Sequence, residues 1–128
     1  GRTAAQQRKK DMAYPITWFE VLGQDTAKLR GFYGELFGWK AEPIPDPNLD
    51  YSQISPAEAG IGGGIGKAQD AADKGWVTVY VRVPDLKSAI AQAERLGGKL
   101  LREIVHLPDL SFAVIADPEG HAVGLITK

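Results

Sequence analysis

The sequence has no cysteine, which excludes disulfide bonds and thiolate chemistry. Its net charge is −1, so it lacks the excess of positive charge with which proteins bind nucleic acids or anionic membranes. No hydrophobic run approaches the roughly 20 residues that span a bilayer, and no signal-peptide pattern is present. We therefore expect a cytoplasmic protein with no nucleic-acid partner and no membrane partner.

The beginning of the sequence lacks the hydrophobic periodicity of the rest. Residues 1–13 are mostly polar and include three consecutive basic residues, Arg8, Lys9 and Lys10. We expect this stretch to be a disordered or cloning-derived leader outside the fold. A basic arm that binds phosphate is the alternative, but three charges on a nearly neutral chain favour it less.

The remaining sequence is sufficient for one folded domain with an internal repeat. The chain has 128 residues, and 44% of them are hydrophobic, which is enough for a single core. Three pairs of residues are offset by 60 positions and share an expected role. Asp25 and Asp85 are expected helix N-caps, Gly38 and Gly98 are expected to end helices, and Gly60 and Gly120 are expected turn glycines. The sequence therefore predicts two copies of one structural unit.

The first copy starts with β-branched and aromatic residues at 16–21, which predict a strand. Asp25 is expected to cap a helix that ends at Gly38, a residue free to adopt positive φ. Hydrophobic residues spaced by three and four predict the face of this helix that packs on the core: Leu29, Phe32, Tyr33, Leu36 and Phe37. An extended segment at 39–44 and strands at 51–54 and in the glycine run 60–66 follow.

The second copy repeats this order. An alternating strand is predicted at 77–83, followed by a helix that Asp85 caps and that Gly97 and Gly98 end. Its core face is made of Leu86, Ala89, Ile90, Ala93 and Leu96. Three further strands are predicted at 99–105, 112–116 and 122–126.

The expected fold class is therefore α+β, with two βαβββ modules. The modules occupy residues 14–68 and 76–128, and a linker at 69–75 joins them into one domain. A single module leaves one sheet face exposed, so the two must pack on each other or on another chain. Two mixed, curved sheets then form a cleft, and clefts between repeats are where small ligands usually bind.

Four segments carry a resemblance to a known superfamily. They are Ile-Thr-Trp-Phe-Glu at 16–20, Phe-Tyr-Gly-Glu-Leu-Phe-Gly-Trp at 32–39, the strand and helix from Val81 to Gly98, and Asp-Pro-Glu-Gly at 117–120. In this order they resemble the vicinal oxygen chelate superfamily, which holds glyoxalase I, bleomycin-resistance proteins, fosfomycin-resistance enzymes and extradiol dioxygenases. The resemblance covers residues 14–128 and implies the fold, but not one activity, because this fold hosts unrelated chemistries.

Enzymes of that superfamily typically bind one divalent metal through His, Gln or Glu on the first and last strands of each module. The resemblance places the four ligand positions on Trp18, Gly64, Thr78 and Gly124, and the offset of 60 agrees with it. None of these residues supplies the imidazole, carboxylate or thiolate that such metals prefer. We therefore expect neither a metal site nor another cofactor.

Glu20 is the acidic residue that we expect to matter most. It shares a strand face with Trp18 and, by the repeat, faces Tyr80, with Arg82 two residues further on. A buried carboxylate in such surroundings can orient a polar ligand or act as a base. A purely structural ion pair or hydrogen bond is equally compatible with this pattern.

The predicted cleft also contains aromatic and other polar side chains. Aromatic walls, including Trp76, suit a flat or cationic ligand, although core packing explains any single ring as well. His106 is a candidate acid or base near neutral pH, or a surface histidine, whereas His121 is expected to belong to a turn. The predicted cleft residues are Trp18, Glu20, Tyr51, Gln53, Thr78, Tyr80, Arg82, His106 and Gly124.

The main functional hypothesis is a metal-independent small-molecule-binding protein, similar in kind to the bleomycin-resistance type. One alternative is a lyase or dioxygenase-like enzyme whose relocated site uses Glu20 or His106, so the sequence leaves open whether the protein is an enzyme. Another is a structural or regulatory protein with an unused cleft. The resemblance also implies a homodimer, because two-module members commonly dimerise. The sequence does not identify the ligand.

Overall fold

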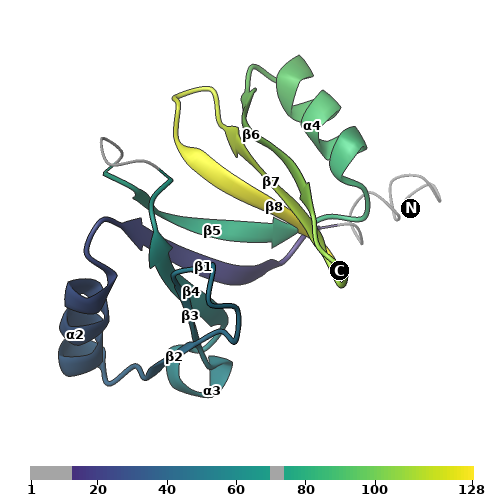
Figure 1. Ribbon diagram of the computed structural model, residues 1–128. Helices are drawn as coiled ribbons and strands as arrows, with labels where there is room; N and C mark the ends of the chain where they lie inside the picture. The colour runs from purple at the N-terminus through teal and green to yellow at the C-terminus, as the bar shows by residue number, and fades with distance from the viewer. Residues whose placement is uncertain (1–12, 70–73) are drawn as a thin grey trace, which may run out of the picture.

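The chain folds into one curved, mixed β-sheet with two longer helices on its outer side (Figure 1). The structure is a computed structural model, and it describes residues 13–69 and 74–128. The expected leader therefore lies, except for Ala13, outside the described residues, as does the centre of the expected linker at 70–73.

Both copies show the predicted order of strand, helix and three strands. In the first copy the elements are β1 (Ile16–Gly23), α2 (Thr26–Phe37), β2 (Ala41–Pro43), β3 (Tyr51–Ile54), a short helix α3 (Pro56–Ala59) and β4 (Gly62–Lys67). In the second copy they are β5 (Trp76–Arg82), α4 (Leu86–Arg95), β6 (Lys99–His106), β7 (Ser111–Ala116) and β8 (Ala122–Thr127). No helix in the described part of the chain is long and apolar enough to cross a membrane.

The two copies share a single eight-stranded sheet, in the order β2-β3-β4-β1-β5-β8-β7-β6. Within each copy the first and last strands pair in parallel, β1 with β4 and β5 with β8. The copies join where β1 pairs with β5 in antiparallel fashion. The first strands of the two modules therefore lie side by side at the centre of the sheet.

The N-caps of the two longer helices and two turn glycines follow the predicted offset of 60. Asp25 accepts a hydrogen bond from the backbone N–H of Lys28 at 3.0 Å, and Asp85 accepts one from that of Ser88 at 3.2 Å. The turn glycines Gly60 and Gly120 have φ values of 91° and 90°. These are left-handed conformations, which favour glycine.

The helix ends differ by one residue from the predicted equivalence. Gly38 ends α2 with φ of 77°, as expected, but in the second copy Gly97 rather than Gly98 has positive φ. Gly98 is required for another reason, because a Cβ there would lie 2.6 Å from the carbonyl oxygen of Ala116. The glycine pair therefore combines a helix end with a close approach to β7.

Each helix packs on its own half of the outer sheet face. Under α4 the buried core consists of Val83, Leu86, Ile90, Ala113 and Leu125. Under α2 it consists of Val21, Ile54 and Ile65, with the partly buried rings of Phe19, Tyr33 and Trp39 against it. Val21 and Phe19 pair with Val77 and Val79 across β1 and β5, so both helices cover the same face.

The predicted core face of α2 is only partly buried. Leu29 and Tyr33 pack against the core, but Phe32, Leu36 and Phe37 are 58%, 59% and 53% exposed. The five apolar positions cover more of the helix circumference than one sheet face can bury. The predicted core face of α2 was therefore too wide, and the helix exposes an apolar strip on its surface.

Candidate functional site

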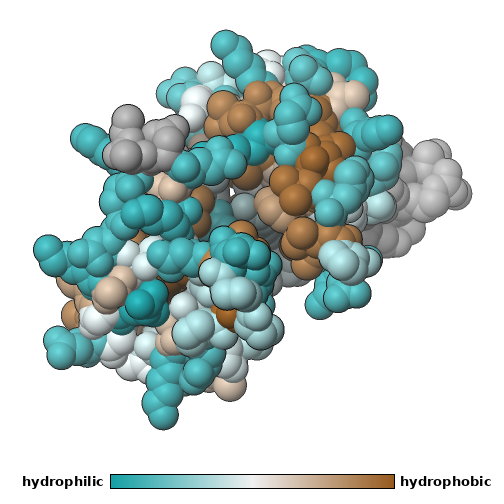
Figure 2. Space-filling model, viewed as in Figure 1, coloured by the Kyte–Doolittle hydropathy of each residue, from teal (hydrophilic) through white to brown (hydrophobic). Residues whose placement is uncertain are grey.

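The sheet face opposite the helices carries a cluster of polar and aromatic side chains at its centre. Trp18 and Glu20 alternate along β1, and their antiparallel partners on β5 are Tyr80 and Thr78. Directly paired residues point to the same side, so these side chains share the inner, concave face. Figure 2 shows a hollow between the two halves of the molecule, with hydrophobic surface gathered on the side of β6 to β8.

Glu20 is the centre of this cluster. The residue is 8% exposed, and its carboxylate accepts three hydrogen bonds from neutral donors. The hydroxyl of Tyr51 donates to Oε1 at 3.2 Å, while the Trp76 indole Nε1 and the Tyr80 hydroxyl donate to Oε2 at 3.1 and 3.0 Å. Three strands, β1, β3 and β5, therefore meet at one carboxylate.

Trp18 extends the network by one step. Its indole Nε1 donates to the Tyr51 hydroxyl oxygen at 2.9 Å, and that hydroxyl in turn donates to Glu20. Tyr51 is thereby fixed both as an acceptor and as a donor. A chain of hydrogen bonds to a buried carboxylate polarises each member, which makes the arrangement more rigid than isolated pairs.

The two tyrosines are held in their protonated form. Burial raises the pKa of Tyr51 well above its ordinary value of 10.0, and the negative charge of Glu20 raises it further. The pKa of Tyr80 is raised for the same two reasons in the same order. Both hydroxyls therefore remain hydrogen-bond donors throughout the physiological pH range.

Glycines on the neighbouring strands make room for the two tyrosine rings. A Cβ on Gly64 of β4 would lie 2.1 Å from the Tyr51 hydroxyl oxygen. A Cβ on Gly124 of β8 would lie 2.4 Å from Cδ1 of Tyr80. The rings thus cover the backbone where a side chain would otherwise stand.

The four positions that the superfamily resemblance assigns to a metal do not fit one. The indole N–H of Trp18 is used on Tyr51, and the Thr78 hydroxyl donates to the carbonyl oxygen of Ala122. Gly64 and Gly124 have no side chain, and tyrosine rings cover them. Within residues 13–69 and 74–128 no group of three or more His, Cys, Asp or Glu residues is placed to hold a metal ion.

Three predicted cleft residues lie outside the cluster. Gln53 pairs with Gly64 on the inner face but is exposed. Arg82 is exposed at the end of β5, where it lines a shallow hollow with Tyr14. His106 is exposed at the end of β6, and its Nδ1 lies 2.8 Å from the Ser111 hydroxyl.

The side chain of His106 also points to the wrong side for a cleft residue. Val105 pairs with Phe112, whose ring centroid lies 6.1 Å from that of Tyr80 in an edge-to-face contact on the inner face. His106 and Ser111 are the next pair along, so they face the opposite side. His121 belongs to the last turn, where its Nδ1 lies 3.0 Å from Oδ2 of Asp117.

Sequence reasoning missed two residues that contact the cluster. The guanidinium carbon of Arg102 on β6 lies 4.8 Å from the centroid of the Trp76 ring, and Phe112 on β7 packs on Tyr80. Both come from strands distant in sequence from Glu20, and β6 contains two register shifts that strand alternation alone does not reveal. No local signal in the sequence identifies either residue.

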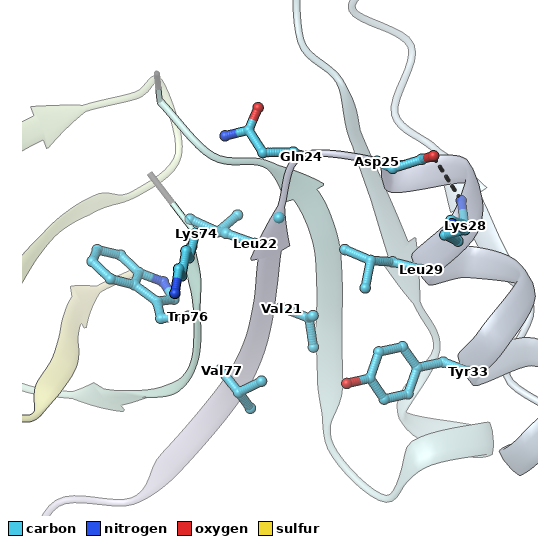
Figure 3. A pocket seen from close by; sticks show the side chains of 12 residues that line it. Val21, Leu22, Gln24, Asp25, Lys28, Leu29, Tyr33, Lys74, Trp76 and Val77 are labelled. Carbon is cyan, nitrogen blue, oxygen red and sulfur yellow. Dashed lines mark hydrogen bonds between the residues drawn. The ribbon is translucent and has the colours of Figure 1, made fainter. Parts of the chain in front are cut away.

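A further hollow, of about 410 Å³, lies where β1 ends and β5 begins (Figure 3). Its wall includes Leu29 and Tyr33 of the outer core and the helix cap formed by Asp25 and Lys28. The Asp25 carboxylate already serves the first turn of α2. Helix packing and capping explain this part of the wall, and Trp76, which also lines the hollow, donates to Glu20. We therefore assign the functional site to the Glu20 cluster.

Comparisons with known proteins agree with this architecture. A protein from Didymella fabae described as a glyoxylase-like domain-containing protein is 25% identical over 121 residues, covering 88% of this chain and 93% of the relative. A glyoxalase/bleomycin resistance protein/dioxygenase superfamily member from Vibrio splendidus has a similar structure, with a TM-score of 0.61 and 10% identity over 91% of this chain and 100% of that one.

A second solved structure with a similar fold is a methylmalonyl-CoA epimerase from Streptomyces coelicolor in complex with 2-nitronate-propionyl-CoA. Its TM-score is 0.58, with 14% identity, over 89% of this chain and 94% of that one. At such identities the structural likeness establishes the fold alone. The family model of the glyoxalase-like domain matches residues 19–126. This chain therefore belongs to the glyoxalase-like domain family, within the vicinal oxygen chelate superfamily.

Proposed function

We propose that this protein binds a small organic molecule on the concave face around Glu20, without the divalent metal that is usual in its superfamily. The observation that carries the proposal is the Glu20 cluster itself. One buried carboxylate, two tyrosine hydroxyls and two indoles converge at the centre of the sheet. A few fixed polar groups among aromatic rings are typical of small-molecule sites.

The chemistry at the expected metal positions supports the metal-independent part of the proposal. Trp18 and Thr78 use their polar hydrogens inside the protein, and tyrosine rings cover the two glycines. A metal bound there would have to displace Tyr51 or Tyr80 and would still lack imidazole or carboxylate donors at the four positions.

Two measurements test the proposal. Elemental analysis of the purified, dialysed protein should find no stoichiometric Zn, Ni, Mn or Fe, and adding these metals should not raise the melting temperature. A thermal-shift screen of small molecules should give ligands that raise it, because binding to the folded state alone stabilises that state. Trp18→Ala should abolish that response. Trp39 lies in the outer core, so its spectroscopic signal serves as an internal control that ligand binding should leave unchanged. A tightly retained stoichiometric metal would contradict the proposal.

The enzymatic alternative rests on Glu20 alone, because His106 lies on the opposite face of the sheet. Glu20 is fixed by three donors rather than held near a nucleophile or a metal. Binding without chemistry therefore accounts better for the arrangement. A lyase or dioxygenase-like activity that is lost in Glu20→Gln while ligand binding persists would favour the alternative.

We also propose that the protein is a cytoplasmic homodimer, as the superfamily resemblance implies. The exposed apolar strip of α2, formed by Phe32, Leu36 and Phe37, offers a surface on which two copies can bury hydrophobic area. Sedimentation velocity should then show a dimer that Leu36→Glu converts into a monomer. A wild-type protein that sediments as a monomer at micromolar concentration would contradict this assignment.

A further inference from the structure

We propose that the cleft binds an organic cation of the guanidinium, amidinium or alkylammonium class, seated on the Trp76 ring beside Glu20. The inference rests on the proposed function, because it names the chemical class of the ligand for the same site. Three observations carry it: the charge of Glu20, the orientation of Trp76 and the place of Arg102.

Glu20 places a carboxylate at the floor of the cleft. The residue is 8% exposed, and the hydrogen bonds to its carboxylate from Tyr51, Trp76 and Tyr80 come from neutral groups. Neutral donors solvate a carboxylate without cancelling its charge. In a partly desolvated site that charge attracts a cation more strongly than it would in water.

Trp76 provides a surface for such a cation. Its indole N–H is bonded to Glu20 Oε2 at 3.1 Å, so one edge of the ring touches the carboxylate. The face of the same ring receives the Arg102 guanidinium, whose central carbon lies 4.8 Å from the ring centroid. A cation within about 6 Å of a tryptophan centroid is in the favourable range for a cation–π interaction.

The position of Arg102 therefore shows that the face of the Trp76 ring accepts a guanidinium group. Arg102 comes from β6, the edge strand of the sheet, and its pairing with Val114 is flanked on both sides by register shifts. Bulges of this kind re-aim side chains, and here the result is a guanidinium placed on Trp76. An edge strand is the part of a sheet that moves at least cost, so a ligand cation can take the position that Arg102 occupies.

An anionic ligand fits the site less well. An anion that pairs with Arg102 has to come close to the Glu20 carboxylate, which Trp76 and Tyr80 fix in place. Like charges in a partly buried site repel each other strongly. A cation is attracted by Glu20, and it competes with Arg102 for the face of the Trp76 ring.

The experiment uses three probes of nearly the same shape and different charge: benzamidinium, benzamide and benzoate. Binding is followed on the full chain by the indole N–H signals in ¹H–¹⁵N NMR spectra, since the chain has only three tryptophans, Trp18, Trp39 and Trp76. Trp39 packs on Tyr33 in the outer core, with ring centroids 5.8 Å apart, and serves as the internal control. We expect benzamidinium to shift Trp76 and Trp18 saturably and to leave Trp39 unchanged. Benzamide and benzoate should bind at least about tenfold more weakly.

Three variants sharpen the test. Glu20→Gln keeps the shape of the side chain and should weaken benzamidinium binding by about tenfold, because the negative charge is gone. Arg102→Met removes the competing guanidinium and should tighten benzamidinium binding severalfold, because the ring face is then free in a larger fraction of molecules. Arg95→Met, at an exposed arginine on α4, is the matched control and should leave binding unchanged.

The outcomes separate this inference from the proposed function. If benzamide or benzoate shifts Trp76 as readily as benzamidinium, the charge class is wrong while the cleft remains a binding site. If no probe shifts Trp18 or Trp76, both proposals fail. If Arg102→Met binds benzamidinium no better than the wild type, the proposed position of the cation on the Trp76 ring is wrong. That last measurement does not depend on whether Glu20→Gln folds.

Discussion

Glu20 and Tyr80 occupy equivalent positions in the two copies of the repeat, 60 residues apart, and are hydrogen-bonded to each other at 3.0 Å. The contact forms because β1 and β5 are neighbours in the sheet and run in opposite directions. A carboxylate on one copy and a phenol on the other thus meet across the junction of the two modules.

Removal of the Tyr80 hydroxyl should destabilise the protein. Tyr80→Phe keeps the ring that packs on Gly124 and Phe112 but deletes one donor to a buried carboxylate. We expect a loss of about 1.5–3 kcal/mol in the free energy of unfolding, measured by urea denaturation. Tyr14→Phe, at an exposed tyrosine, is the control and should change stability by less than about 0.5 kcal/mol. Equal effects in the two variants would contradict a special role for the Glu20–Tyr80 bond.

Two glycine-to-alanine substitutions should have opposite effects on stability. In Gly124→Ala the new Cβ would lie 2.4 Å from Cδ1 of Tyr80, so the ring has to move, at a cost of about 1–3 kcal/mol. Gly31→Ala, in the middle of α2, meets no atom within 4 Å and should stabilise the protein by about 0.5–1 kcal/mol through helix propensity. Thermal unfolding of both variants measures the difference, and a stabilised Gly124→Ala would show that Tyr80 does not lie on β8.

The buried tyrosines should make the protein sensitive to alkaline pH. Folding raises the pKa of Tyr51 and Tyr80, so above the ordinary pKa of 10.0 the unfolded chain loses protons that the folded chain keeps. The free energy of unfolding should therefore be unaffected by these groups below that pH and fall above it, by up to about 2.7 kcal/mol per pH unit for the pair. The double variant Tyr51→Phe and Tyr80→Phe should lack this part of the slope in urea titrations between pH 9 and 11.

Deletion of the Glu20 side chain should create a site for small carboxylates. Glu20→Ala leaves three donors, on Tyr51, Trp76 and Tyr80, without their acceptor, and we expect a loss of more than about 3 kcal/mol in stability. Formate or acetate that fills the vacated position should recover part of this loss, because a ligand of the folded state raises its stability.

The melting temperature of Glu20→Ala in sodium formate, compared with sodium chloride at equal ionic strength, measures this recovery. The wild type serves as the control and should show no difference between the two salts. An equal response in both proteins would mean that formate does not occupy the position of the deleted carboxylate.

The local signals in the sequence predicted the elements because they arise from neighbouring residues. Asp25 and Asp85 cap helices through their own first turns, and Gly60 and Gly120 adopt positive φ in their own turns. The short helix α3 was missed, although Ser55 followed by Pro56 is a typical N-cap and first helical residue, and Ser55 does accept from the Ala57 N–H. A four-residue helix is too short to produce a hydrophobic period, which explains the omission.

The site itself was predictable only as far as the repeat extends. The offset of 60 identified Tyr80 as a neighbour of Glu20, although the two are diagonal neighbours because the direct partner of Glu20 is Thr78. Strand alternation placed Trp18 on the same face. The position of Tyr51 depends on the pairing of β3 with β4, and that of Arg102 on the irregular pairing of β6 with β7. Such long-range registers are set by the assembled sheet rather than by the local sequence. The face of His106 was within reach of local reasoning, because alternation from Ile104, which packs on the outer core, already places His106 on the outer side.

The antiparallel junction of β1 and β5 also restricts how this site can have arisen. Two identical units paired in this way would place the same residue type at both central positions, either two carboxylates that repel each other or two phenols without a charged acceptor. The pairing of one acid with one phenol needs the two units to differ in sequence, as the two halves of this chain do. The central hydrogen bond is thus a property of the duplicated chain that neither half, alone or as a symmetric pair, can reproduce.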